Sequence, residues 1–394
     1  MTALDRPGLA GYLPGWVTAR RGRLAGWQTV DWILVGSALV LSLLGSVLIW
    51  SATRPRLLEA GGNQLAFFER HLMNLTIGLV LGVVAAALNY RNLRASAPVL
   101  YAAACLGLVA VLLIGSTING SHSWIVLGGG FQVQPSEFAK VAVVVTMAMI
   151  FAERSEQDGH RRYDVPLVLL LAGVPAGLIM LQPDVGTIMV LTFTIFALLA
   201  VAEVDWRWLV ALALFAVVVA VGAVKFGVLK DYQLDRFRAF TNPQANTQGA
   251  AYNVTQARIA IGNGGLTGTG LFKGTQTNGK FVPEQQTDFV FTVAGEELGF
   301  AGAGGIVLLF GLMLWRALRI AGRSPDQFGR LVAVGVSAWF AFQTFVNIGM
   351  TLGIMPVTGL PLPFVSYGGS AMFANCIAIG LLVNVHRRTL AAEH

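Results

Sequence analysis

The sequence predicts an all-α integral membrane protein with ten transmembrane helices and a long structured outer loop between the seventh and eighth helices. Charged residues make up 12% of the chain and hydrophobic residues 55%. Soluble domains carry roughly 25% charged residues, so about half of the usual surface charge is missing. Apolar runs near the ~20 residues that cross a bilayer recur along the chain. Composition and run length together place the protein in the membrane class.

The spans follow from these apolar runs. The run 165–203 is interrupted by Gln182-Pro183-Asp184, so two helices joined by a turn fit better than one long helix. The first run is too long for a signal-peptide core and indicates a retained anchor. The predicted spans are 30–51, 70–88, 97–115, 137–152, 165–181, 186–203, 208–226, 288–314, 331–352 and 367–386.

The distribution of arginine predicts the orientation. Cytoplasmic loops of membrane proteins carry an excess of Lys and Arg. The short outer loops hold only Arg54, Arg56 and Arg70, whereas arginines recur in every predicted inner segment. Both termini are therefore expected in the cytoplasm. The expected organisation is a cytoplasmic tail over 1–29, a membrane domain over 30–388 with an outer loop over 227–287, and a cytoplasmic tail over 389–394.

Several function classes are disfavoured by the same composition. The net charge is +7, but the basic residues are scattered between apolar runs, which argues against nucleic-acid binding. Cys105 and Cys376 each lie in an apolar run and are expected to be small buried hydrophobes, without a disulfide or a metal site. The histidines show no metal-ligand spacing.

The outer loop 227–287 does not have the composition of a linker. Charged residues around Arg236 are followed by an amphipathic stretch that contains Arg258, and then by a cluster of glycines. A structured loop of this length in a compact protein is usually functional.

Ionisable residues in or beside a span are costly and are therefore candidate sites. Glu137 and Lys140 stand three residues apart at the start of a predicted helix, as a local ion pair or as part of a polar site. Asp184 lies in the turn before another span, where it either caps the helix or faces a cavity. Sequence alone leaves both alternatives open.

Asp288 is the most informative carboxylate, because it stands where the long outer loop enters a predicted span. The helix dipole would lower its pKa, whereas partial desolvation would raise it. Glu296 and Glu297 lie about 12 Å deeper on an ideal helix. They either join the helix to its neighbours or extend an acidic cavity.

The segment 356–370 joins the last two spans and holds Ser366 and Tyr367 among three prolines and several glycines. Irregular backbone at membrane depth is tolerated only where protein buries it or where it lines a cavity. The residues therefore predict an outward-facing polar cavity with carboxylates under an ordered loop. This description fits a transporter and an enzyme that acts on a lipid head group equally well.

The same segments resemble the SEDS family (shape, elongation, division and sporulation) of membrane glycosyltransferases. Six motifs occur in the family's order and span about 30–388: QPSEFAK, QPDVGT, IAIGNGGLTGTG, PEQQTDFVFTVAGEELGF, MPVTGLPLPFVSYGGS and NVHRR. The stretch NIGMTLGIMPVTG together with NVHRR looks more like the RodA-like, rod-shape branch than the division branch.

The resemblance implies a ten-helix fold and lipid II as the substrate in a bacterial cell membrane. The 4-hydroxyl of one lipid-linked disaccharide would attack the anomeric carbon of another and displace undecaprenyl pyrophosphate. The essential aspartate of the family's TDF motif carries over to Asp288, as general base. Lys140, Arg236, Arg258 or a divalent cation such as Mg²⁺ or Mn²⁺ would assist the leaving pyrophosphate. The remaining expected substrate-binding residues are Glu137, Asp184, Thr287, Glu297, Ser366 and Tyr367.

The resemblance also implies a class B penicillin-binding protein as transpeptidase partner. Three positions depart from the family's pattern. His122 stands where a basic residue usually precedes Trp124, Thr269 where a lysine is common, and Gln286 where histidine is frequent. His122 would contact phosphate only when protonated.

Two other function classes compete with the glycosyltransferase. A lipid II flippase would also place charges around a cavity, but such transporters are often built from paired repeats, and none is evident here. A non-catalytic scaffold for a cell-wall synthase is the third hypothesis.

Overall fold

The computed structural model describes residues 29–118, 121–127, 131–156, 164–225, 227, 231–241 and 249–393. Within these residues, eight helices are long and apolar enough to cross a membrane. They are α2 (Trp32–Glu59), α3 (Ala66–Ala87), α4 (Tyr90–Ile114), α5 (Pro135–Glu156), α8 (Trp206–Lys225), α13 (Gly299–Arg323), α14 (Gln327–Leu352) and α15 (Gly369–Glu393). The predicted membrane class is confirmed.

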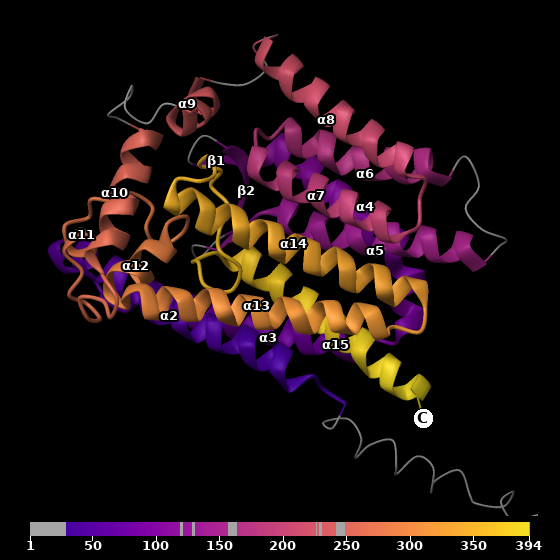
Figure 1. Cartoon of the computed structure of the whole chain (residues 1–394), viewed down its shortest axis with the longest axis horizontal. Helices are drawn as coiled ribbons and strands as arrows, with labels where there is room; N and C mark the ends of the chain where they lie inside the picture. The colour runs from indigo at the N-terminus through magenta and orange to yellow at the C-terminus, as the bar shows by residue number, and fades with distance from the viewer. Residues whose placement is uncertain are drawn as a thin grey trace, which may run out of the picture.

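Two shorter apolar helices, α6 (Asp164–Met180) and α7 (Val185–Val201), occupy the run that Gln182-Pro183-Asp184 interrupts. Pro183 adopts a φ of 29°, so the chain turns there instead of continuing as one helix. The elements run alongside one another as a bundle (Figure 1). A total of ten spans stays a prediction, because α6 and α7 are short for a bilayer.

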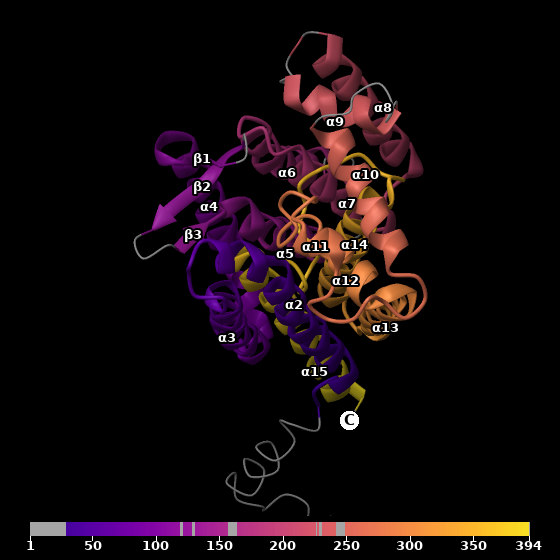
Figure 2. The same cartoon turned by 90° about the vertical axis from the view of Figure 1, so that its left-hand side faces the viewer.

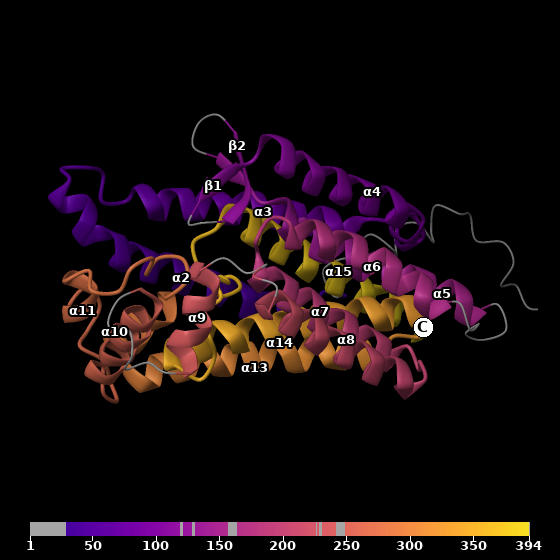
Figure 3. The same cartoon turned by 90° about the horizontal axis from the view of Figure 1, so that it is seen from above.

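The outer loop contains regular structure, as the sequence predicted. Its helices are α9 (Asp231–Thr241), α10 (Ala250–Asn263) and α11 (Thr275–Asn278). The view from above places all three at one end of the bundle (Figure 3). The predicted tail 1–29 lies outside the described residues except for Thr29. The predicted tail 389–394 is, as far as residue 393, the last turn of α15.

The all-α prediction missed a small antiparallel sheet between α4 and α5. Its strands are β1 (Ser116–Ile118), β2 (Ser121–Leu127) and β3 (Phe131–Val133), with β2 in the centre. The strands project beside the outer end of α4 (Figure 2). β1 and β3 have three residues each, and the seven residues of β2, SHSWIVL, do not alternate between apolar and polar, so no period-of-two pattern marks the sheet.

The predicted span 288–314 was wrong at its outer end. A short helix, α12 (Val290–Glu297), ends before α13 begins at Gly299, which has a φ of 66°. The loop around Gly265 packs into this break, and Phe300 N donates to Gly265 O at 2.9 Å. Asp288 therefore precedes a short helix at the outer end and does not start the membrane-spanning helix itself.

Helix α5 and helices α14 and α15 form the centre of the bundle, whereas α8 contacts little besides α7. Helices α3 and α15 approach closely because small residues face each other. A Cβ on Gly380 would lie 2.2 Å from Gly82 O, and one on Gly78 would lie 2.9 Å from Cys376 Sγ. At the end away from the outer loop, the Asp31 carboxylate caps α2 and accepts from Arg316 Nε at 2.9 Å.

This close approach predicts that Gly380→Val separates α3 from α15. The added side chain has no space, and overpacking of this kind costs about 1–3 kcal/mol. The apparent melting temperature in detergent, followed by size-exclusion chromatography, should fall. Gly304→Val is the matched control, because nothing lies within 4 Å of a Cβ at Gly304 on α13. Equal melting temperatures for the two variants would contradict the packing described here.

Candidate functional site

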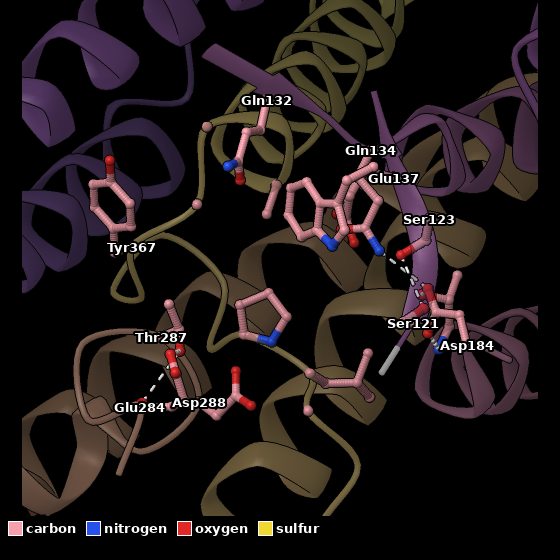
Figure 4. Close-up of a pocket in the computed structure, with 18 of the residues that line it drawn as sticks. Ser121, Ser123, Gln132, Gln134, Glu137, Asp184, Glu284, Thr287, Asp288 and Tyr367 are labelled. Atoms are coloured by element: carbon pink, nitrogen blue, oxygen red, sulfur yellow. Dashed lines mark hydrogen bonds between the residues drawn. The ribbon is translucent and has the colours of Figure 1, made fainter. Parts of the chain in front are cut away.

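A cavity of about 670 Å³ opens at the end of the bundle where α9 lies. Its walls come from α3, the β2–β3 hairpin, the starts of α5 and α7, α9, the segment before α12 and the segment between α14 and α15. Figure 4 shows ten of its polar side chains. Segments far apart in the sequence thus converge on one space, as the sequence predicted.

Asp288 lies half-buried in the cavity wall, beside Glu284 and Thr287 (Figure 4). A tight turn places it there, because Glu284 adopts a φ of 49° and its carbonyl oxygen accepts from the backbone N–H of Asp288 at 3.0 Å. No side chain caps the N-terminus of α12. Asp288 therefore makes no capping hydrogen bond to α12, and it lines the cavity.

Arg236 of α9 lies close to Asp288 in this wall. Gly359 is next to both side chains, because a Cβ on Gly359 would lie 3.5 Å from Asp288 Oδ2 and 3.6 Å from Arg236 Nη1. Gly359 itself has a φ of 75°, which favours glycine. The guanidinium also donates to Thr358 O at 3.2 Å. Helix α9 of the outer loop thus places the Arg236 guanidinium close to the Asp288 carboxylate.

Desolvation by the surrounding chain raises the pKa of Asp288 from 3.8 to about 6. Arg236 opposes this rise, Glu284 adds to it through like-charge repulsion, and a hydrogen bond from Thr287 opposes it. A carboxylate with a pKa near 6 is ionised at neutral pH but is a stronger base than an exposed aspartate. This electrostatic arrangement suits proton abstraction.

Asp184 both caps a helix and lines the cavity, so both of the predicted alternatives hold. Its Oδ1 accepts from Thr187 N at 3.0 Å, and its Oδ2 accepts from Thr187 Oγ1 at 2.8 Å. Oδ2 also accepts from Gln134 Nε2 at 3.1 Å. Asp184 is therefore a fixed group that orients Gln134 at the cavity surface.

Glu137 and Lys140 form a buried ion pair, with Lys140 Nζ 2.9 Å from Glu137 Oε1. The ammonium also donates to Gln343 Oε1 at 3.0 Å and lies 4.5 Å from the centroid of the Trp339 ring. Glu137 lines the cavity, whereas Lys140, only 1% exposed, does not. The structure thus turns Lys140 into the helix bundle, away from the space where a pyrophosphate would lie.

The segment before α15 is a rigid irregular wall. Leu362 N donates to Ser366 Oγ at 2.8 Å, which closes a turn, and Tyr367 N donates to Gln286 O at 2.9 Å. Tyr367 lines the cavity, and its ring packs edge-on against Phe67 with centroids 5.1 Å apart. Ser366 is buried behind this wall and does not line the cavity.

Two further predicted residues lie outside the cavity. Arg258 of α10 is exposed and packs near Gly353 at the end of α14. Glu297 is buried and accepts from Ser51 Oγ of α2 at 2.6 Å. Its neighbour Glu296 accepts from Gln276 N and Thr277 N at the start of α11. These two carboxylates join α12 to its neighbours, which was one of the two predicted alternatives.

Sequence reasoning missed several cavity residues. Arg70 lies at the outer end of α3 and Trp124 on the unpredicted strand β2. Arg70 was treated as a loop charge, although its position at a span end was a signal. The other missed polar side chains are Asn74, Ser121, Ser123, Gln132, Gln134, Thr187, Gln233, Glu284, Gln286 and Thr358. Most are neutral amides and hydroxyls, whose sequence signal is weak.

Among the residues that the structure describes, no group of three or more His, Cys, Asp or Glu side chains could hold a metal ion. Mg²⁺ is commonly bound by one or two carboxylates together with substrate phosphates. The exposed Glu284 is a carboxylate of the cavity that fits such a shared site.

Comparison with known proteins defines the class. The model of the FtsW/RodA/SpoVE family, described as cell cycle proteins, matches residues 31–390. The chain belongs to this family, a family of multi-pass membrane proteins, and the resemblance drawn from its motifs is confirmed.

Individual relatives cover nearly the whole chain. The peptidoglycan glycosyltransferase MrdB of Escherichia coli (strain K12) is 36% identical over 88% of this chain and 91% of its own length. Stage V sporulation protein E of Bacillus subtilis (strain 168) is 36% identical over 91% of this chain and 97% of its own length. A chain of a solved peptidoglycan synthase complex is 34% identical with a TM-score of 0.76, covering 91% of this chain and 98% of that one. The rod shape determining protein RodA of Thermus thermophilus is 33% identical with a TM-score of 0.68. The match covers 92% of this chain and 98% of the RodA chain.

The placement of Lys140 predicts a structural effect for its replacement. Lys140→Met leaves Glu137 as an uncompensated buried charge, which typically costs 3–5 kcal/mol. The apparent melting temperature in detergent should fall strongly, and the double variant Glu137→Gln/Lys140→Met should recover most of the loss. A single variant with unchanged stability would instead indicate that Lys140 is free to serve a ligand.

Proposed function

We propose that the chain polymerises lipid II into glycan strands at the outer face of a bacterial cell membrane, with Asp288 as general base. Its family relatives are named peptidoglycan glycosyltransferases, and the chain is an enzyme of that kind. The observation that carries the proposal is the placement of Asp288 in the cavity wall beside Arg236, with a pKa of about 6. Like the rod-shape relatives, it would act in cell elongation.

The chemistry is a displacement at a sugar carbon. The oxygen of a 4-hydroxyl group on one lipid-linked disaccharide forms a bond to the anomeric carbon of another. The bond from that carbon to the pyrophosphate oxygen breaks, and undecaprenyl pyrophosphate leaves with the electron pair. The hydroxyl proton passes to the Asp288 carboxylate, which must lie within about 3 Å of that oxygen in the complex.

The leaving pyrophosphate gains negative charge and needs cations close by. Among the described residues that line the cavity, the cations are Arg70 and Arg236. Lys140 is committed to Glu137, and Arg258 lies outside the cavity, so the expected phosphate-binding role passes to these two arginines. A Mg²⁺ or Mn²⁺ ion held by the phosphates and by Glu284 would neutralise part of the same charge.

The cavity also has an apolar flank that suits a lipid-linked substrate. Met73 and Ile77 follow Arg70 along the cavity side of α3, at helical spacing. Leu127, Phe131 and Phe373 also line the cavity. A charged head group beside Arg70 could therefore continue into an apolar chain along α3. Glu137, Asp184, Thr287 and Tyr367 complete the expected substrate-binding set within the cavity.

Two further parts of the proposal concern the setting. We expect both termini in the cytoplasm, which places the cavity on the outer side. We also expect a class B penicillin-binding protein as partner, since one structural relative belongs to a peptidoglycan synthase complex.

Asp288→Asn should insert and fold normally but lose at least about 100-fold in polymerisation rate, because it keeps the shape and removes the base. Purified protein, lipid II and Mg²⁺ or Mn²⁺ would be incubated in detergent and glycan chains resolved on a gel, with EDTA testing the cation. Loss of folding would point to a structural role for Asp288. Precursor that crosses liposomes without polymer would favour a flippase.

The pKa of Asp288 predicts a pH dependence. The Asp288 carboxylate is ionised above its pKa of about 6 and can act as a base only in that form. The polymerisation rate should therefore increase as the pH is raised through about 6. Arg236→Gln removes an interaction that lowers this pKa, and the acidic limb should move to higher pH. Glu284→Gln removes a repulsion that raises it, and the limb should move to lower pH. Shifts in the opposite directions would exclude Asp288 as the titrating base.

A further inference from the structure

One wall of the cavity has a chemistry that the transfer step does not use. It consists of polar and aromatic groups from the β2–β3 hairpin and the starts of α5 and α7. We name it the hairpin wall, and its residues are Ser121, Ser123, Trp124, Gln132, Gln134 and Asp184. Figure 4 shows Ser121, Ser123, Gln134 and Asp184 gathered across the cavity from Asp288.

The hairpin wall is unsuited to a phosphate. Neither cation that lines the cavity in the described residues, Arg70 or Arg236, comes from it. Lys140 is buried against Glu137, and His122 contacts Thr117 Oγ1 at 3.1 Å outside the cavity lining. Asp184 forms no ion pair within the described part of the chain. Its negative charge would repel a pyrophosphate, since like charges a few ångströms apart are strongly unfavourable at low dielectric.

The polar groups of the hairpin wall are held in place before any ligand arrives. Asp184 fixes the Gln134 amide through Nε2, so the carbonyl end of that amide has a set direction. Ser121 Oγ lies 2.9 Å from both Gln182 O and Ser123 Oγ. Groups preorganised in this way lose little entropy when they bind a ligand.

Trp124 supplies the apolar part of the same surface. The indole is half-buried, and within the described residues its N–H has no acceptor and its ring has no aromatic partner. Tryptophan N–H groups usually find a partner when they are buried. An indole that is left open to a cavity can donate to a ligand hydroxyl, and its electron-rich face attracts the C–H groups of a sugar ring.

We propose that the hairpin wall is a saccharide subsite, which binds an uncharged pyranose ring through Trp124, Gln134 and Ser123, while Arg70 and Arg236, which belong to other elements, bind the pyrophosphate. Hydroxyls, an amide and an indole without a cation match a neutral polyhydroxylated ligand. Asp184 acts as a positioning residue for Gln134. The inference rests on the proposed function, because it assigns the saccharide part of the lipid-linked substrate to this wall of the cavity.

Direct binding to the purified full-length chain in detergent tests the subsite. One probe is the disaccharide pentapeptide as its methyl glycoside, without phosphate or lipid. The other is undecaprenyl pyrophosphate, without sugar. Trp124→Ala should weaken binding of the saccharide at least tenfold and change binding of the pyrophosphate less than twofold. Trp124→Phe, which keeps an aromatic face but lacks the N–H, should give an intermediate loss.

Trp315→Ala is the matched control, because Trp315 is exposed on α13, lies outside the cavity and contacts Arg316 and Arg319. It should leave binding of both probes unchanged. If Trp124→Ala fails to fold, Gln134→Leu and Ser123→Ala provide the same comparison, each with a selective loss of saccharide binding. Equal weakening of both probes, or of neither, overturns the subsite.

The outcomes also separate this inference from the proposed function. If the wild type polymerises lipid II but saccharide binding is insensitive to the hairpin wall, the subsite is wrong and the glycosyltransferase stands. If the wild type neither polymerises lipid II nor binds either probe, the proposed function fails and the subsite fails with it.

Discussion

Two amide side chains of α14 hold together the irregular segment on which the cavity depends. Asn347 Nδ2 donates to Asp288 O at 2.9 Å and to Leu360 O at 2.7 Å. Gln343 Nε2 donates to Pro361 O at 2.8 Å. Backbone carbonyls that leave regular structure inside a membrane protein need a partner, because each unsatisfied group costs several kcal/mol. These two amides supply it, and so allow a proline-rich wall at the outer end of the bundle.

The same two residues connect the wall to the carboxylates. Asn347 joins the backbone of Asp288 to the segment that carries Gly359, so the position of the carboxylate follows from the position of α14. Gln343 Oε1 accepts from Lys140 Nζ and from Trp339 Nε1, at 3.0 and 2.7 Å. Lys140 thus helps to hold Gln343, which in turn binds the irregular segment at Pro361. Glu137 neutralises the charge of Lys140 in the absence of substrate.

The charged residues around Asp288 and the polar residues of the hairpin wall come from different segments of the chain. Arg236 and Glu284 lie close enough to Asp288 to alter its pKa, which is expected where a proton has to move. In the hairpin wall, the Asp184 carboxylate accepts hydrogen bonds from Gln134 and Thr187 and fixes the polar groups around it. A ligand with a charged end and an uncharged polar end would lie across the cavity in one orientation. Family membership makes the lipid-linked saccharide the natural candidate for that ligand.

The sequence by itself determined the membrane class, most of the helices and the family. Apolar runs of bilayer length leave few alternatives, and motifs in a set order identify relatives even when contacts are unknown. The family's TDF motif also pointed to Asp288 as a candidate, although the structure places this residue before the short helix α12 and not at the start of the membrane-spanning helix. These features depend on local composition, which can be read without knowing what lies beside each residue.

Only the tertiary structure decided which polar residues face the cavity. Lys140, Glu297, Arg258 and Ser366 are residue types that are typical of binding sites, yet none of the four lines the cavity. Gln134 opens one of the family motifs and Trp124 belongs to another family pattern, but neither pattern shows that these two side chains face the cavity. The break before Gly299 likewise depends on the glycine loop that packs into it. Which way a side chain points depends on contacts with residues far away in the sequence. Local composition does not reveal those contacts.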